Sequence, residues 1–73
     1  MTKLGIYLAQ RSVNKAEIGR KTGLGRHRIG ELCNNESSRL NVEELYKIAL
    51  AINVDPGEML KDICKDISLN TVL

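Results

Sequence analysis

Apolar residues recur three and four positions apart through most of this chain, the spacing that places them on one face of an α-helix. The pattern predicts five short helices, over residues 3–11, 15–22, 25–34, 42–52 and 56–64, with 67 as the furthest end of the last one. Val42 is expected to begin the apolar face of the fourth helix, and Met59 and Ile63 to face inward from the fifth. The side chains expected in one shared core are Leu4, Leu8, Ile18, Leu24, Ile29, Leu32, Leu45, Ile48, Ala49, Ile52 and Leu60.

Three helix starts carry recognisable capping signals. Asn14 and Asn41 each stand three residues before a glutamate, Glu17 and Glu44, which is the arrangement of a capping box. The run Asp55-Pro56-Gly57-Glu58 combines a capping aspartate, a proline at the first helical position and an acid at the third. These signals place the starts of the second, fourth and fifth helices.

The segment from Asn14 to Asn34 reads as a short helix, a tight glycine turn and a second short helix. Gly23 stands where the first of them must stop, because glycine takes the left-handed conformation without a steric penalty. Leu24 follows and can drop between the two helices. Gly19 is costly inside a helix, by about 1 kcal/mol relative to alanine, so we expect the next helix to approach closely there. This is a helix-turn-helix, and the exposed start of its second helix, Arg26-His27-Arg28, is basic and points to the major groove of DNA.

The composition fits one small domain, residues 1–67, followed by a tail, residues 68–73, that is a candidate dimer contact. Of the 73 residues 42% are hydrophobic, which is normal for a globular domain, and with no Phe or Trp the core must be aliphatic. No apolar run approaches the length of a membrane span. The first residues, MTKLGIYLAQ, lack the apolar core of a signal peptide, so a cytoplasmic protein is expected.

The chain has few residues suited to metal or redox chemistry. Cys33 and Cys64 form no CxxC pair, and with one histidine in the chain a four-ligand zinc site is not expected. Both cysteines are predicted to be reduced core or interface residues. No nucleophile–base pair is visible, so neither an enzyme nor a cofactor is predicted.

The net charge of +2 is unevenly distributed along the chain. Residues 1–39 hold eight Lys or Arg against three acids, a formal charge of +5, and residues 40–73 hold three against six, a charge of −3. A basic half beside an acidic half suggests that one face meets a polyanion.

Several of these residues together resemble the Cro/repressor-like helix-turn-helix domains (the XRE family) of phage and bacterial transcriptional regulators. They are Glu17-Ile18-Gly19 before Gly23, Leu24 in the turn, Ile29 and Leu32 after it, and downstream LYKIALAINVDPGEML. The resemblance covers Leu4 to Leu60. It implies an all-α, five-helix lambda-repressor-like fold with the helix-turn-helix at helices two and three.

The chain departs from the family pattern in three respects. The family usually has Gln at the first position of helix two, where its amide binds a phosphate, and this chain has Lys15. It usually caps helix three with Ser or Thr, and this chain has the weaker cap Gly25. It often pairs an Arg in helix one with a Glu near the end of helix three; the matching positions here are Leu8 and Cys33, which replaces an ion pair by apolar contact.

The resemblance implies two sets of DNA-contacting residues. Base-reading positions are Gly25, Arg26, His27, Arg28 and Glu31, and the arginine fork is suited to O6 and N7 of guanine. Phosphate-binding positions are Asn14, Lys15, Asn34 and Arg39. His27 is nearly as well explained as exposed filler, and Asn14 as a cap alone. Glu31 either accepts from cytosine or orients an Arg one turn earlier, the second being slightly favoured.

Two classes of function compete. The first is a sequence-specific regulator of double-stranded DNA, a dimeric repressor or the antitoxin of a toxin–antitoxin pair, with a homodimer made by helix five and Ile63, Ile67, Leu69, Val72 and Leu73. The second is a helical adaptor that binds a protein and no longer binds DNA. Two arginines flanking His27 favour the first, because a domain that no longer binds DNA is expected to lose the basic residues at the start of its recognition helix.

Overall fold

The structure of the chain is a computed structural model that describes residues 1–69. Those residues form five α-helices and no strand, which confirms the all-α, five-helix fold expected from the sequence. The helices are α1 (Lys3–Gln10), α2 (Lys15–Thr22), α3 (Arg26–Asn34), α4 (Val42–Ala51) and α5 (Pro56–Ile63). Each lies within one or two residues of its predicted bounds.

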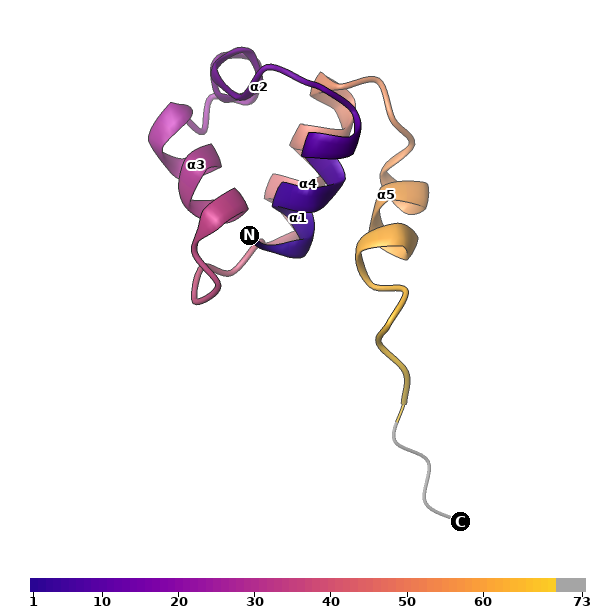
Figure 1. Ribbon diagram of the computed structural model, residues 1–73. Helices are drawn as coiled ribbons and strands as arrows, with labels where there is room; N and C mark the ends of the chain where they lie inside the picture. The colour runs from indigo at the N-terminus through magenta and orange to yellow at the C-terminus, as the bar shows by residue number, and fades with distance from the viewer. Residues whose placement is uncertain (70–73) are drawn as a thin grey trace.

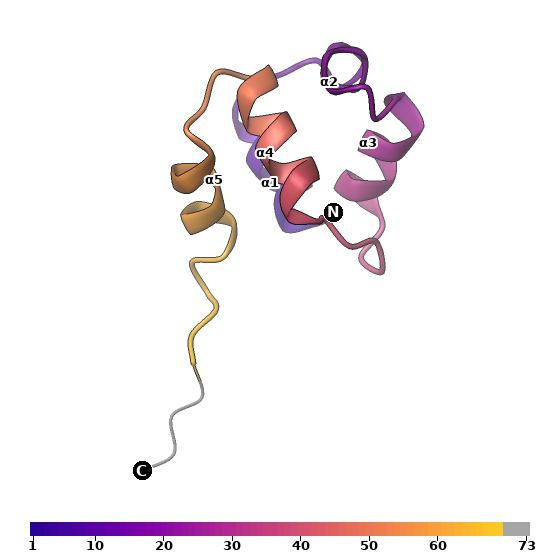
Figure 2. The same cartoon turned by 180° about the vertical axis from the view of Figure 1, so that it is seen from behind.

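The first four helices surround one core, and α5 covers it from the side opposite α3 (Figure 1). Helix α4 packs against α2 and α5, and α1 packs against α3 and α5. Seen from behind, α5 stands beside α4, and residues 65–69 lead away from the bundle (Figure 2). Helix α3 is therefore left with one broad outer face on the opposite side of the molecule.

The core is aliphatic apart from one tyrosine, as the composition predicted. Its buried side chains are Leu4, Tyr7, Leu8, Ile18, Ile29, Leu32, Cys33, Leu45, Ile48, Ala49 and Met59, with Leu24 and Ile52 partly buried against them. Two expectations are wrong. Leu60 is 49% exposed and Met59 is buried in its place, because α5 is covered on one side only. Val42 is 83% exposed, and Glu44 is the buried residue in the first turn of α4.

The predicted capping signals form, with one correction. Asn41 and Glu44 make the full capping box, and Asp55 accepts from the backbone N–H of Glu58 at 3.0 Å. At α2 only half of the box exists: Asn14 accepts from the N–H of Glu17 at 3.1 Å, but the carboxylate of Glu17 pairs with Arg20 instead. That pairing joins residues one turn apart on an exposed helix face, where an acid and a base three apart are neighbours.

The start of α1 is tied to the end of α3 by Thr2, a contact that the sequence analysis did not anticipate. The Thr2 hydroxyl accepts from the N–H of Gly5 at 3.0 Å and donates to the carbonyl of Leu32 at 2.6 Å, with the carbonyl of Cys33 at 3.0 Å. The Thr2 N–H also donates to the carbonyl of Cys33 at 2.9 Å. One residue thus satisfies an unpaired donor of one helix and unpaired acceptors of another. A threonine directly before a helix was the available signal.

Candidate nucleic-acid interface

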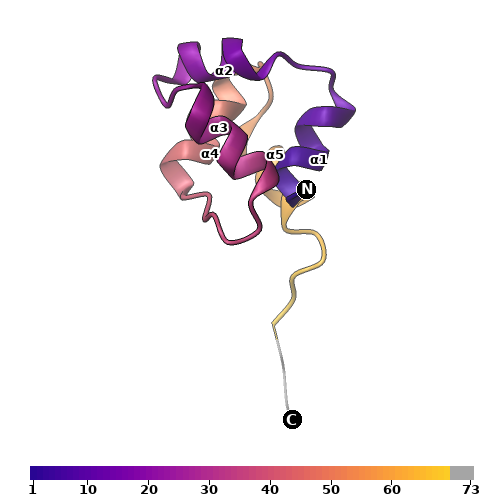
Figure 3. The same ribbon diagram turned by 60° about the vertical axis from the view of Figure 1, so that its left-hand side comes forward.

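The turn between α2 and α3 sets their relative orientation. Gly23 has φ +77° and Gly25 has φ +88°, conformations that side-chain-bearing residues adopt only with strain. Leu24, between them, packs partly buried against the core. Helix α3 therefore leaves the turn at a steep angle to α2, as Figure 3 shows. This confirms the helix-turn-helix geometry expected from the glycine spacing.

Gly19 of α2 lies in close contact with the backbone at the start of α3. The Gly25 N–H donates to the Gly19 carbonyl at 3.1 Å. A Cβ on Gly19 would lie 2.7 Å from the carbonyl carbon of Gly25 and 2.8 Å from the nitrogen of Arg26. The predicted close approach of helix three is thus confirmed, and it fixes where the first turn of α3 lies.

The first turn of α3 is exposed, basic and uncapped by a side chain. Gly25 is its N-cap and makes no side-chain hydrogen bond, and the first turn contains no acid. Arg26 and His27 are exposed. Positive side chains at a helix N-terminus oppose the helix dipole, so they destabilise the free protein slightly unless a ligand compensates. An anionic partner such as DNA supplies that compensation.

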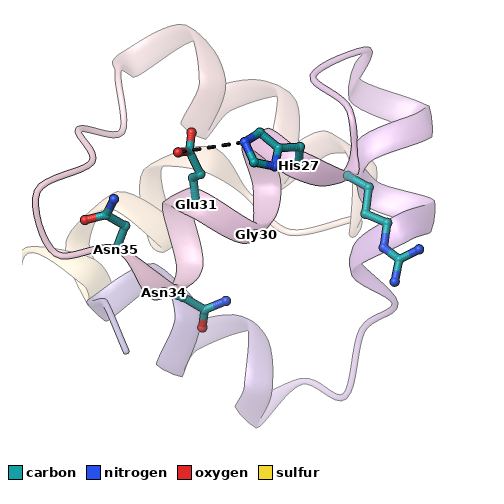
Figure 4. A pocket seen from close by; sticks show the side chains of 6 residues that line it. His27, Gly30, Glu31, Asn34 and Asn35 are labelled. Atoms are coloured by element: carbon teal, nitrogen blue, oxygen red, sulfur yellow. Dashed lines mark ion pairs between the residues drawn. The ribbon is translucent and has the colours of Figure 1, made fainter.

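A shallow pocket runs along the outer face of α3, from its first turn to its last. Its lining residues are Arg26, His27, Gly30, Glu31, Asn34 and Asn35, and Figure 4 shows the view onto them. Glu31 points toward His27, with a carboxylate-to-Nε2 distance of 3.9 Å. Glu31 thus lies beside the imidazole one turn earlier, and its charge also acts on Arg28, whose guanidinium pKa is raised by Glu44 together with Glu31. Glu31 and His27 bring together donor and acceptor groups suited to base edges.

Arg28 is directed away from this pocket, toward α4. Its Nε donates to Glu44 Oε2 at 2.8 Å, and one terminal nitrogen donates to Glu44 Oε1 and to the carbonyl of Arg39, both at 3.1 Å. The Arg28 side chain is 34% exposed and that of Glu44 is 9% exposed. The structure thus separates Arg28 from the other predicted base-reading residues.

Glu44 is held as a carboxylate at this position. Its pKa is lowered chiefly by the hydrogen bonds from Arg28; burial acts against this, while the backbone N–H of Asn41 and the charges of Arg28 and Lys47 lower the pKa further. Sequence reasoning assigned Glu44 only a capping role. No local signal links residues 28 and 44, which are 16 positions apart.

The predicted phosphate-binding residues lie at the start of α2, at the end of α3 and in the loop after α3. Lys15 is the half-buried first residue of α2, directly after Asn14, whose side chain acts as the cap. Asn34 is exposed and lines the pocket at the far end of α3. Arg39 is exposed in the loop that follows, with its carbonyl held by Arg28.

Other kinds of site receive no support from the described part of the chain. Residues 1–69 contain no cluster of three His, Cys, Asp or Glu side chains that suits a metal ion. Both cysteines are free thiols, Cys33 buried in the core and Cys64 half-buried. Burial raises the pKa of the Cys33 thiol, with Lys15 acting weakly in the opposite direction. None of the helices formed by these residues has the length and apolar character needed to cross a bilayer.

Two crossing helices, a glycine turn and a basic, exposed second helix define a helix-turn-helix DNA-binding domain. The chain belongs to the family of Cro/C1-type HTH DNA-binding domains, whose family model matches residues 3–65. Comparisons with curated proteins and with solved structures yield no match. The family resemblance expected from the sequence is confirmed, and DNA is the partner that this family membership supports.

Proposed function

We propose that the protein is a sequence-specific regulator of transcription, acting as a repressor in the cytoplasm, that reads the major groove of double-stranded DNA with α3. The observation that carries the proposal is the exposed, basic and uncapped first turn of α3, which directly follows the glycine turn. A shallow pocket over Gly30, Glu31 and Asn34 lies beside it. A helix presented in this way fits the major groove, where base edges are distinguishable.

Within this proposal, reading is assigned to Gly25, Arg26, His27 and Glu31. Arg26 is a long, exposed donor fork in the first turn, suited to guanine. His27 and Glu31 face each other and present both donors and acceptors. Asn14, Lys15, Asn34 and Arg39 are assigned to the phosphates on either side of the groove.

Selection from random duplex DNA is the direct test. We expect one enriched sequence, and enrichment of a palindrome if the protein binds as a twofold dimer. Recovery of no sequence above the starting pool would contradict the proposed function.

Charge contacts and base contacts are separable in a second experiment. Replacing Lys15 or Arg39 by Ala should weaken binding to operator and scrambled duplexes about equally. The salt dependence of that binding should fall by roughly one phosphate contact per half-site. Arg26→Lys keeps the charge but loses the forked guanidinium. Binding to the operator should therefore weaken by about 1–3 kcal/mol, while binding to scrambled DNA changes little. Lys3→Ala, at an exposed lysine on α1 that belongs to neither assigned set, is the matched control. An unchanged ratio of operator to scrambled affinity in Arg26→Lys would remove Arg26 from the reading set.

A homodimer is proposed for the bound state, formed by α5 and the residues that follow it. Ile67 and Leu69 are 67% and 88% exposed, and Ile63 is only partly buried. Val72 and Leu73, the other two residues of the expected contact, lie outside the described residues. A single small module covers few base pairs, and a twofold pair places two recognition helices about 34 Å apart.

An antitoxin is the second candidate, and one observation favours it. Helix α4 has three exposed apolar side chains at helical spacing, Val42, Tyr46 and Leu50. Such a stripe suits a protein partner such as a toxin. Co-expression with the product of the adjoining gene tests this: a complex that is lost in Tyr46→Ser would support the antitoxin, and absence of a complex would remove it.

A further inference from the structure

One side chain connects the two segments proposed to contact DNA. Arg28 belongs to α3, and its guanidinium holds both Glu44 at the start of α4 and the carbonyl of Arg39 in the intervening loop. The three contacts use two of its nitrogens at 2.8 to 3.1 Å, in the forked geometry that matches a carboxylate. We call this group of Arg28, Glu44 and the Arg39 carbonyl the α3–α4 clamp.

Burial and the capping box of α4 hold the Glu44 carboxylate in place. Glu44 is 7% exposed, and its Oε1 also accepts from the N–H of Asn41 at 3.1 Å to complete the capping box of α4. If Arg28 turned into a DNA groove, the carboxylate would stay in this buried position without its charged partner. Leaving one member of such a pair unsatisfied is strongly unfavourable.

Arg26 provides a contrast two positions earlier. It is exposed and lines the outer pocket of α3. The hydrogen bonds to Glu44 and to the Arg39 carbonyl come from Arg28. Two arginines that are chemically equivalent in the sequence therefore face different partners. One is available to DNA, and the other is bound within the protein.

We propose that Arg28 is a positioning residue that sets the angle of α3 against the loop carrying Arg39 and leaves base reading to the residues of the outer pocket. This proposal rests on the proposed function, since it concerns how the same helix reads DNA. The clamp makes the recognition helix and the loop move as one unit. Reading residues and phosphate contacts then meet the duplex in a fixed register, which is what specific binding requires.

A double-mutant cycle tests the clamp. The variants are Arg28→Ala, Glu44→Gln and the two combined, with Glu43→Gln as the control, because it makes the same charge change at an exposed neighbour. Affinities for the selected operator and for a scrambled duplex are measured at a temperature where circular dichroism shows every variant folded. Arg28→Gln, which removes the charge and keeps much of the side-chain length, replaces Arg28→Ala if the latter does not fold. Random-duplex selection is repeated with each folded variant.

If the clamp positions α3, Glu44→Gln should lower the ratio of operator to scrambled affinity by roughly tenfold, although Glu44 is too buried to reach a base. Arg28→Ala should have about the same effect, and the combined variant little more, because all three break one interaction. The enriched base sequence should stay unchanged. Glu43→Gln should leave the ratio as it is.

Two results would overturn the proposal. One is an unchanged ratio in Glu44→Gln together with a lost base preference in Arg28→Ala, which would make Arg28 a base reader. The other is an unchanged ratio in all the variants, which would limit the clamp to stability. Failure of the proposed function is a separate outcome: the wild-type protein itself would then show no preference among duplexes, and the positioning role would fail with it.

Discussion

At the scale of single residues, the helical glycines differ in whether their surroundings leave room for a side chain. Gly19 is required by the backbone of the turn, and a Cβ on Gly5 would lie 2.3 Å from the carbonyl oxygen of Cys33. Gly30 lies in the middle of α3, where a Cβ would meet nothing within 4 Å. The helix interior therefore gains nothing from the missing side chain at Gly30.

We expect Gly30→Ala to stabilise the free protein by about 0.5–1 kcal/mol, because alanine loses less conformational entropy in a helix. For a domain of this size that is a rise in melting temperature of roughly 4 °C. Thermal denaturation followed by circular dichroism measures it, and Gly19→Ala is the control that should melt lower. A lower melting point for Gly30→Ala would show that the open space is filled in solution.

Thr2 offers a second prediction at this scale. Thr2→Val keeps the shape of the side chain but removes the hydroxyl that joins α1 to the end of α3. The expected loss is about 1–2 kcal/mol, typical of a helix cap with an additional acceptor. Thr2→Ser, which keeps the hydroxyl, should stay near wild type in urea denaturation. Equal midpoints for the Val and Ser variants would contradict the role assigned to the hydroxyl.

At the scale of elements, the helix ends were largely predictable and the links between helices were not. Asn41, Asp55 and Gly23 act within four residues of themselves, so their roles follow from local sequence. The capping box at Glu17 failed because Arg20 offered its carboxylate another local partner. The α3–α4 link through Glu44 depends on two helices meeting, and no local pattern announces it.

Acidification should weaken that link. The folded-state pKa of Glu44 is below its ordinary value, so its contribution to stability is fully present above the unfolded pKa, about 4.3, and is lost as the pH falls through the lower folded value. The melting-temperature difference between wild type and Glu44→Gln should therefore be largest near neutral pH and shrink below about pH 4. A difference that stays constant down to pH 2–3, well below the unfolded value, would show that the charge of Glu44 is not what matters.

At the scale of the whole molecule, the helix that we propose for DNA reading and the helix that we propose for the dimer contact lie on different sides. Helix α3 lies on one side of the core and α5 on the other, as Figures 1 and 2 show. The basic first half of the sequence supplies α3 and its neighbours, and the acidic second half supplies α4 and α5. This division matches the charge asymmetry of the sequence, and the dimer contact that we propose through α5 leaves α3 uncovered.

Truncation after Cys64 tests the proposed dimer. Sedimentation of the full chain with an operator duplex should show two protomers per duplex, whereas the truncated chain should bind as a monomer and at least tenfold more weakly. Circular dichroism of the truncated chain checks that the five helices remain. Unchanged affinity after truncation, or one protomer per full operator, would contradict a dimer made by this region.

By itself the sequence determined the five helices, the glycine turn and the family, because helix periodicity, capping and left-handed glycines act over a few residues. It also determined that the core would be aliphatic, since there was no Phe or Trp to fill it.

Only the tertiary structure decided which of several suitable side chains took each place. Met59 is buried and Leu60 is not, because one side of α5 faces the core. Arg28 binds Glu44 while Arg26 stays exposed, because the position of α4 brings a buried carboxylate to one arginine and not to the other. Such choices depend on distances between segments far apart in the chain, and a local pattern carries no information about those distances.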